Sequence, residues 1–153
     1  MNKPRFVIDT TSLISYFPDL FNQGSKISAK ALSIIDKAFA DENSALIVVP
    51  SVVFVEIFDK WFSGDKSAND EFRARFNIDV FQTISKASNF EIRELDNEIL
   101  EKFVELNDSN INLENRDKII LASAMVLEAP IITSDGIIIK YISKHKIKSS
   151  YLS

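Results

Sequence analysis

Residues 46–62 read LIVVPSVVFVEIFDKWF, and this stretch determines the fold class. Its first part, Leu46 to Val49, is a short apolar run rich in β-branched residues, which is typical of a buried strand. Pro50 and Ser51 end that run. The apolar residues that follow recur at helical spacing: Val52, Val55, Phe58 and Phe62. A buried strand followed directly by an amphipathic helix is one unit of an α/β protein.

The same alternation extends in both directions along the chain. Short strands are predicted at Phe6–Ile8, Phe90–Leu95 and Ile131–Thr133, with a further edge strand within Ile147–Tyr151. Helices are predicted between them, at Thr11–Phe17, Ile27–Ala40, Val52–Phe62, Asn97–Leu106 and Arg116–Glu128. Strands separated by helices favour a parallel sheet covered on both faces. We therefore predict one domain, residues 1–153, with an α/β three-layer α/β/α sandwich and a central, mostly parallel sheet.

Composition excludes several classes of chemistry. The 153 residues contain no Cys and one His (His145), so disulfides, thiolate zinc sites and paired imidazoles are excluded within one chain. The net charge of −4 argues against a general polycation that coats nucleic acid. No signal peptide is visible, and the longest apolar stretch, Ala45 to Phe58, is interrupted by polar residues and is too short to cross a bilayer. We expect a cytoplasmic protein with no membrane contact.

Four acidic residues are directed to one edge of the predicted sheet. Asp9 and Asp135 follow strands, while Glu56 and Asp117 lie near the starts of helices that run back antiparallel to the strands. In parallel sheets, ligands bind at the carboxyl ends of the strands. Each aspartate could instead cap a helix or interact with a helix dipole, and Glu56 could lie on a solvated face. The convergence of four is more specific than any one of them.

Clustered carboxylates repel one another unless a cation neutralises them or some of them take up protons. Oxygen ligands suit Mg²⁺ or Mn²⁺, and these ions promote phosphodiester hydrolysis by activating a water and stabilising the leaving oxygen. That chemistry requires no His or Cys. The sequence therefore predicts catalytic and metal-binding roles for Asp9, Glu56, Asp117 and Asp135.

Four ordered motifs resemble the PIN-domain ribonucleases over nearly the whole chain. The motifs are Val7–Ile14 with its first acid, Pro50–Glu56, Arg116–Ala124 and Ile131–Asp135. The resemblance implies that the four acids hold the metal and that Thr11, Thr133 and Ser134 are supporting polar residues. Thr11 stands where the family usually has Asn or Ser, and the 63–77 segment is longer than in the smallest members.

Small members of that family are often VapC-like toxins of toxin–antitoxin pairs. The resemblance implies a Mg²⁺- or Mn²⁺-dependent endoribonuclease that cleaves RNA through a metal-bound water held by four carboxylates. It also implies a small antitoxin as partner and a homodimer. Arg116, Lys144 and Lys146 could contact RNA, although a solvated surface is the simpler explanation for the two lysines.

Two other functions stay open at this point. The chain could be a catalytically silent scaffold of the same fold that binds RNA or protein. It could also be a phosphoryl-accepting, receiver-like domain, with Asp9 as the acceptor. No second acid stands beside Asp9, which argues against a receiver, and the glycine-rich phosphate loop of nucleotide hydrolases is absent.

Overall fold

The computed structural model describes residues 3–24, 26–62, 66–147 and 151–152. Its sheet has five strands: β1 (Arg5–Ile8), β2 (Leu46–Pro50), β3 (Phe90–Arg93), β4 (Ile131–Ile132) and β5 (Tyr151–Leu152). They lie in the order β3-β2-β1-β4-β5, and every neighbouring pair is parallel. The predicted α/β sandwich with a mostly parallel sheet is therefore confirmed, and the sheet is parallel throughout.

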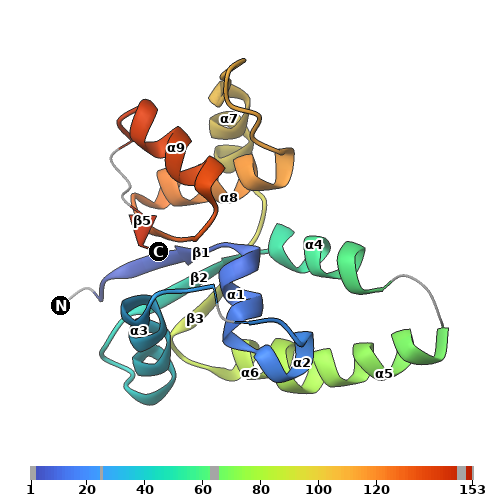
Figure 1. The fold of residues 1–153 in the computed structure, drawn as a ribbon. Helices are drawn as coiled ribbons and strands as arrows, with labels where there is room; N and C mark the ends of the chain where they lie inside the picture. Colours follow the sequence, from blue (N-terminus) through green and yellow to red (C-terminus); the bar gives the residue numbers. More distant parts are fainter. Residues whose placement is uncertain (1–2, 25, 63–65, 148–150, 153) are drawn as a thin grey trace.

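Helices cover both sides of this sheet (Figure 1). In chain order they are α1 (Thr10–Tyr16), α2 (Pro18–Phe21), α3 (Ala29–Ala40), α4 (Val52–Trp61), α5 (Lys66–Phe76), the π-helix η1 (Asn77–Phe81), α6 (Gln82–Lys86), α7 (Asn97–Glu105), α8 (Asn115–Leu127) and α9 (Gly136–Lys144). Figure 1 places α7, α8 and α9 above the sheet and α1, α2, α3 and α6 below it. None of the helices in the described ranges has the length and apolar character needed to cross a bilayer.

The strand order reverses direction at β1. From β1 the chain adds β2 and then β3 on one side, and it returns to add β4 and β5 on the other side. In the pairing of β1 with β4, Val7 lies opposite Ile131 and Ile8 lies opposite Ile132. The helices that leave β1 and β4 diverge at such a reversal and open a crevice at the carboxyl ends of the two strands. The fold therefore sets the position of a site before any side chain is considered.

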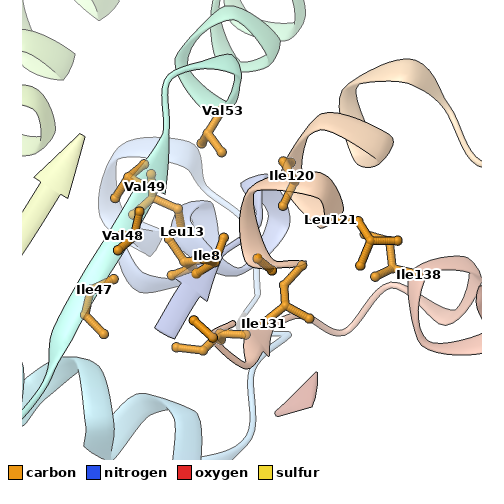
Figure 2. Packing of buried hydrophobic residues seen from close by; sticks show 14 of the residues in the cluster. Ile8, Leu13, Ile47, Val48, Val49, Val53, Ile120, Leu121, Ile131 and Ile138 are labelled. Carbon is orange, nitrogen blue, oxygen red and sulfur yellow. The ribbon is translucent and has the colours of Figure 1, made fainter. Parts of the chain in front are cut away.

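Aliphatic side chains hold the layers together. Ile8, Ile47 and Ile131 on neighbouring strands are completely buried. Leu13 from α1 and Leu121 from α8 are buried against the same sheet, and Figure 2 shows these side chains converging on one core. Because both faces of the sheet are covered, the strands are continuous apolar runs rather than alternating ones. This core fixes the strand ends that carry the acidic residues.

Three local predictions were incomplete. No helix was predicted after residue 135, but Asp135 accepts hydrogen bonds from Ile137 N and Ile138 N and caps α9, a role that the sequence left open for it. No helix was assigned within the 63–77 segment, but α5 starts at Lys66 and continues through η1 into α6. Residues 63–65 of that segment lie outside the described ranges. The edge strand is β5, at the end of the predicted range, and residues 148–150 also lie outside the described ranges.

Candidate active site

An acidic cavity of about 250 Å³ opens at the carboxyl edge of the sheet. All four predicted acids line it: Asp9, Glu56, Asp117 and Asp135. They come from the end of β1, the second turn of α4, the first turn of α8 and the cap of α9. Thr10, Thr11, Lys60, Asn112, Glu114 and Ile137 complete the lining. The structure thus brings the four acids into one hollow, where strand order and helix direction predict them to meet.

Asp9 is the most firmly held of these acids. Its side chain is buried, and Oδ1 accepts a hydrogen bond of 2.9 Å from Ser12 N, which caps α1. Oδ2 accepts a hydrogen bond from the hydroxyl of Thr133, which is also completely buried. Burial raises the pKa of Asp9, and the Thr133 hydrogen bond opposes that rise. Asp9 therefore caps α1 through Oδ1 and is also one of the residues that line the cavity.

Thr133 connects two of the acids. Besides donating to Asp9, its hydroxyl oxygen accepts a hydrogen bond of 3.0 Å from Asp135 N. Asp135 is in turn fixed by α9, because Oδ1 accepts from Ile137 N at 2.8 Å. Thr11 lines the cavity, whereas Ser134 is half-buried and lies outside the cavity lining. Of the three predicted supporting residues, Thr133 is the one that contacts the acids.

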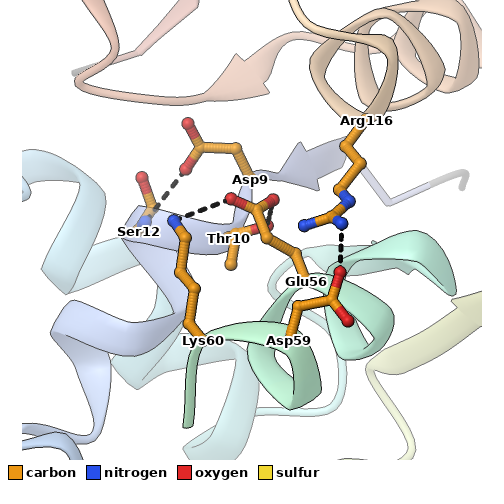
Figure 3. A network of polar contacts seen from close by, with 7 residues as sticks. All are labelled: Asp9, Thr10, Ser12, Glu56, Asp59, Lys60 and Arg116. Carbon is orange, nitrogen blue, oxygen red and sulfur yellow. Dashed lines mark hydrogen bonds and ion pairs between the residues drawn. The ribbon is translucent and has the colours of Figure 1, made fainter. Parts of the chain in front are cut away.

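Two residues that hold Glu56 were not predicted. The buried hydroxyl of Thr10 donates to Glu56 Oε2 at 2.7 Å, and Lys60 Nζ lies 2.9 Å from Glu56 Oε1 (Figure 3). Lys60 follows Glu56 by four residues, which places the two side chains on the same face of α4. That spacing was visible in the sequence. The Thr10 contact spans 46 residues and depends on the packing of α1 against α4.

Asp117 is the acid with the least compensation. Burial raises its pKa to about 7, and repulsion from Asp135, Glu56, Glu114 and Asp9 adds to the rise. The donor set is rich in oxygen and excess negative charge, which suits a hard divalent cation. Within the described ranges, however, no three acidic or imidazole side chains are close enough together to form a ready-made metal site. The residues fit such an ion in chemistry, and their carboxylates would have to close around it.

The predicted basic residues lie in different surroundings. Arg116 forms an ion pair with Asp59 of α4 beside the cavity (Figure 3). Lys144 Nζ lies 2.7 Å from Asp108 Oδ2, and Lys146 is exposed. Because α9 begins at the cavity and rises about 1.5 Å per residue, Lys144 lies roughly 12 Å further along the helix axis. The structure therefore places Arg116 next to the acids and Lys144 well away from them.

His145 takes part in the same remote cluster. Its Nε2 lies 2.8 Å from Asp108 Oδ2, and its ring stacks on Tyr141 with centroids 4.2 Å apart. Lys144 holds the pKa of Asp108 well below its usual range, with further help from Asn110 N and His145. The cluster ties the loop before α8 to the end of α9. We find no geometric reason to assign the single histidine to the acidic cavity.

Replacing Asp108 with asparagine is expected to lower the melting temperature at pH 6, because the mutation removes the acceptor of Lys144 and His145. Since the folded-state pKa of Asp108 is depressed, its contribution is present above its unfolded pKa, about 4, and is lost as the pH falls below that value. The difference between wild type and Asp108→Asn should therefore shrink between pH 5 and pH 2. Asp79→Asn is the matched control, because the Arg75 Nε to Asp79 Oδ2 distance is 3.9 Å in an exposed pair. Equal losses in both variants at pH 6 would contradict this role for Asp108.

Comparison with known proteins gives matches among solved structures. One matched chain belongs to the crystal structure of FitAcB from Neisseria gonorrhoeae, with a TM-score of 0.67, 10% identity and coverage of 97% of this chain and 96% of that chain. Another belongs to VapBC2 from Rickettsia felis bound to a DNA fragment from their promoter, with a TM-score of 0.60, 15% identity and coverage of 96% of both chains. These likenesses establish the fold over nearly the whole chain.

The comparisons also correct the family assignment. No family model matches this sequence, and no curated protein matches it. The assignment of the chain to the PIN-domain ribonucleases as a VapC-like toxin was therefore wrong. The assignment rested on four short motifs, each of which combines a strand or the start of a helix with an acidic residue. Such patterns follow from an α/β fold with acids at one sheet edge, and at 10% and 15% identity the solved structures establish that fold alone.

Proposed function

We propose that this chain is a divalent-metal-dependent endoribonuclease with a toxin–antitoxin-related role. The observation that carries the proposal is the acidic cavity at the strand-order reversal, lined by Asp9, Glu56, Asp117 and Asp135. The raised pKa of Asp117 supports it, because a carboxylate under such repulsion gains most from a cation. We assign all four acids as the ligands of Mg²⁺ or Mn²⁺.

Each part of the cavity has its own task in this proposal. Bound Mg²⁺ or Mn²⁺ supplies a Lewis acid for the phosphate and lowers the pKa of water towards neutrality. Thr133 and Ser12 N orient Asp9, Thr10 orients Glu56, and the first turn of α9 orients Asp135. Holding three of the four carboxylates in this way limits their reorganisation when charge develops on the phosphate. Arg116 beside the cavity is a candidate contact for RNA phosphate, and Lys144 and Lys146 are more distant candidates.

The toxin–antitoxin part rests on the likeness in fold to FitAcB and VapBC2, which we take as toxin–antitoxin complexes. It implies a partner protein for this chain that inhibits the cleavage. A homodimer is a further expectation. Sedimentation at several concentrations, with and without a co-expressed neighbouring gene product, tests both associations.

Removal of the metal tests the enzymatic part. We expect purified protein to cleave a mixed RNA pool in Mg²⁺ or Mn²⁺, and we expect EDTA to reduce cleavage to background because the carboxylates alone cannot activate water. Adding back Mn²⁺ should restore the cuts. Cleavage by the wild type that persists in EDTA would contradict the proposal. Asp9→Asn is purified and assayed beside the wild type to exclude a contaminating nuclease.

One observation favours a second candidate, a catalytically silent scaffold that binds RNA or protein. Within the described ranges, no three acidic side chains stand in ready-made metal geometry, and Lys60 already neutralises Glu56. A scaffold would bind RNA with equal affinity in Mn²⁺ and in EDTA and would cleave none of it. An active enzyme would cleave in Mn²⁺ and lose that activity in Asp9→Asn.

A further inference from the structure

Lys60 stands out because, among the described residues that line the cavity, it is the one with a basic side chain. Its Nζ lies 2.9 Å from Glu56 Oε1, and half of its side chain is exposed, against 11% for Glu56. The ammonium therefore neutralises one of the carboxylates assigned to the metal. A long exposed side chain on a less exposed carboxylate is a contact that can open without disturbing the core.

The two oxygens of Glu56 are held by unequal donors. Oε2 accepts a hydrogen bond of 2.7 Å from the hydroxyl of Thr10, which is 3% exposed and belongs to the first turn of α1. Oε1 accepts from Lys60, whose four-carbon stem leaves its ammonium free to turn towards solvent. A cation that approaches Glu56 thus meets one fixed donor and one displaceable donor. Among the described residues, Lys60 is the donor to Oε1, and a metal ion would have to take its place there.

We propose that Lys60 changes partner during the reaction. In the metal-free protein it is a built-in counter-cation on Glu56, and a divalent ion that takes Oε1 releases it to a phosphate of the RNA at the mouth of the cavity. The inference rests on the proposed function, because it requires both a metal and an anionic substrate. In this proposal, Lys60 couples occupancy of the metal site to the binding of substrate.

Electrostatics gives the exchange its direction. Before the metal binds, the carboxylates dominate the cavity, so an ammonium is best placed on one of them. Once a divalent ion offsets part of this negative charge, repulsion between the ion and Lys60 favours separation of the two cations. An RNA phosphate at the mouth of the cavity then offers the released ammonium an anion, and lysine binds phosphate as a point charge. The same side chain therefore weakens metal binding and strengthens substrate binding.

The metal half is tested by titrating Mn²⁺ into the protein in a calorimeter, without RNA. Lys60→Gln is expected to bind Mn²⁺ about 2- to 5-fold more tightly than wild type, the effect of removing a half-exposed ion pair. Lys86→Gln removes the same charge at the end of α6, away from the cavity lining, and should leave the affinity unchanged. Unchanged affinity in Lys60→Gln would overturn the inference.

A double-mutant cycle separates competition for Glu56 from a general effect of charge. The gain from Lys60→Gln should disappear in the Glu56→Gln background, because Lys60 then has no carboxylate to occupy. A gain of the same size in both backgrounds would overturn the inference. Failure of the proposed function has a different signature, since wild type itself would then take up no Mn²⁺.

The substrate half is tested by the salt dependence of binding to a mixed-sequence single-stranded RNA oligonucleotide. Ca²⁺ replaces Mg²⁺ in this assay to fill the oxygen site. Loss of one phosphate contact in Lys60→Gln is expected to reduce the slope of log K against log salt by about 0.7. Lys86→Gln should keep the wild-type slope. An unchanged slope in Lys60→Gln would overturn the exchange of partners.

Discussion

Asp117→Asn is expected to lower RNA cleavage by about 10²- to 10³-fold and, at the same time, to stabilise the metal-free protein at pH 8. The two effects have one cause. Asp117 is held among Asp135, Glu56, Glu114 and Asp9, and burial together with their repulsion raises its pKa to about 7. Asparagine keeps the shape of the side chain and removes the charge that a cation would bind. It therefore removes a ligand and a source of repulsion together.

The pH dependence follows from the direction of the pKa shift. The folded protein holds the Asp117 proton more tightly than the unfolded chain does, so its contribution to stability is complete below pH 4 and is lost as the pH rises through 7. Because Asp117 is only partly buried, solvent screening reduces the cost of its charge at pH 8 to about 1–2 kcal/mol. A change of that size corresponds to roughly 3–6 °C in melting temperature.

Thermal unfolding at pH 4, 6 and 8, with and without Mg²⁺, measures this prediction. The advantage of Asp117→Asn over wild type should be near zero at pH 4 and largest at pH 8. Mg²⁺ should raise the melting temperature of wild type but not that of Asp117→Asn. Glu101→Gln on the exposed side of α7 is the matched control and should follow wild type. An Asp117→Asn protein that is less stable than wild type at pH 8 would show that Asp117 is not under repulsion.

Thr133→Val is expected to lower cleavage by about 10²-fold and the free energy of unfolding by about 1–3 kcal/mol. Valine has nearly the volume of threonine but no hydroxyl. The change leaves Asp9 Oδ2 without its buried donor and Asp135 N without its acceptor, so two acids lose their fixed positions together. Loss of a hydrogen bond that lowers the pKa of Asp9 should also move the acidic limb of the pH–rate profile upward.

Thr133→Ser distinguishes this role from simple packing. Serine keeps the hydroxyl and removes a methyl group, so it should keep most of the activity while losing a modest amount of stability. Urea unfolding and cleavage rates from pH 5 to pH 9 measure both variants. Equal loss of activity in Thr133→Val and Thr133→Ser would contradict the hydroxyl bridge, because serine keeps the hydroxyl that valine lacks.

The sequence predicted secondary structure well where burial of a strand or helix restricts which residues are allowed. The runs at Phe6–Ile8 and Leu46–Val49 became β1 and β2 because a strand covered on both sides admits few polar residues. The five-residue π-helix η1 had no such signal, since its turns are set by how Val80 and its neighbours pack. The start of α9 was missed because Ser134 and Gly136 are turn residues in the sequence, while Asp135 between them is a helix cap.

The cavity shows the same division. The topology alone predicts that Asp9, Glu56, Asp117 and Asp135 lie at one edge of the sheet, because the carboxyl ends of the strands and the starts of the following helices lie there. Partner choice within the cavity was beyond the sequence, as Thr10 rather than Thr11 meets Glu56 and Thr133 rather than Ser134 meets Asp9. The local backbone points the side chains of neighbouring hydroxyl residues in different directions, and the sequence alone does not show which of them faces the acid.

The reversal of strand order at β1 has a consequence for synthesis on the ribosome. Asp9 and Thr133, which bind each other, are separated by 124 positions, so the first acid emerges long before the strand that completes its surroundings. A nascent chain can build β1, β2 and β3 with their helices while the place of β4 stays empty. The acidic hollow therefore matures last, when nearly the whole chain has left the exit tunnel. A chain truncated before residue 131 should consequently lack both the bridge and any activity that depends on it.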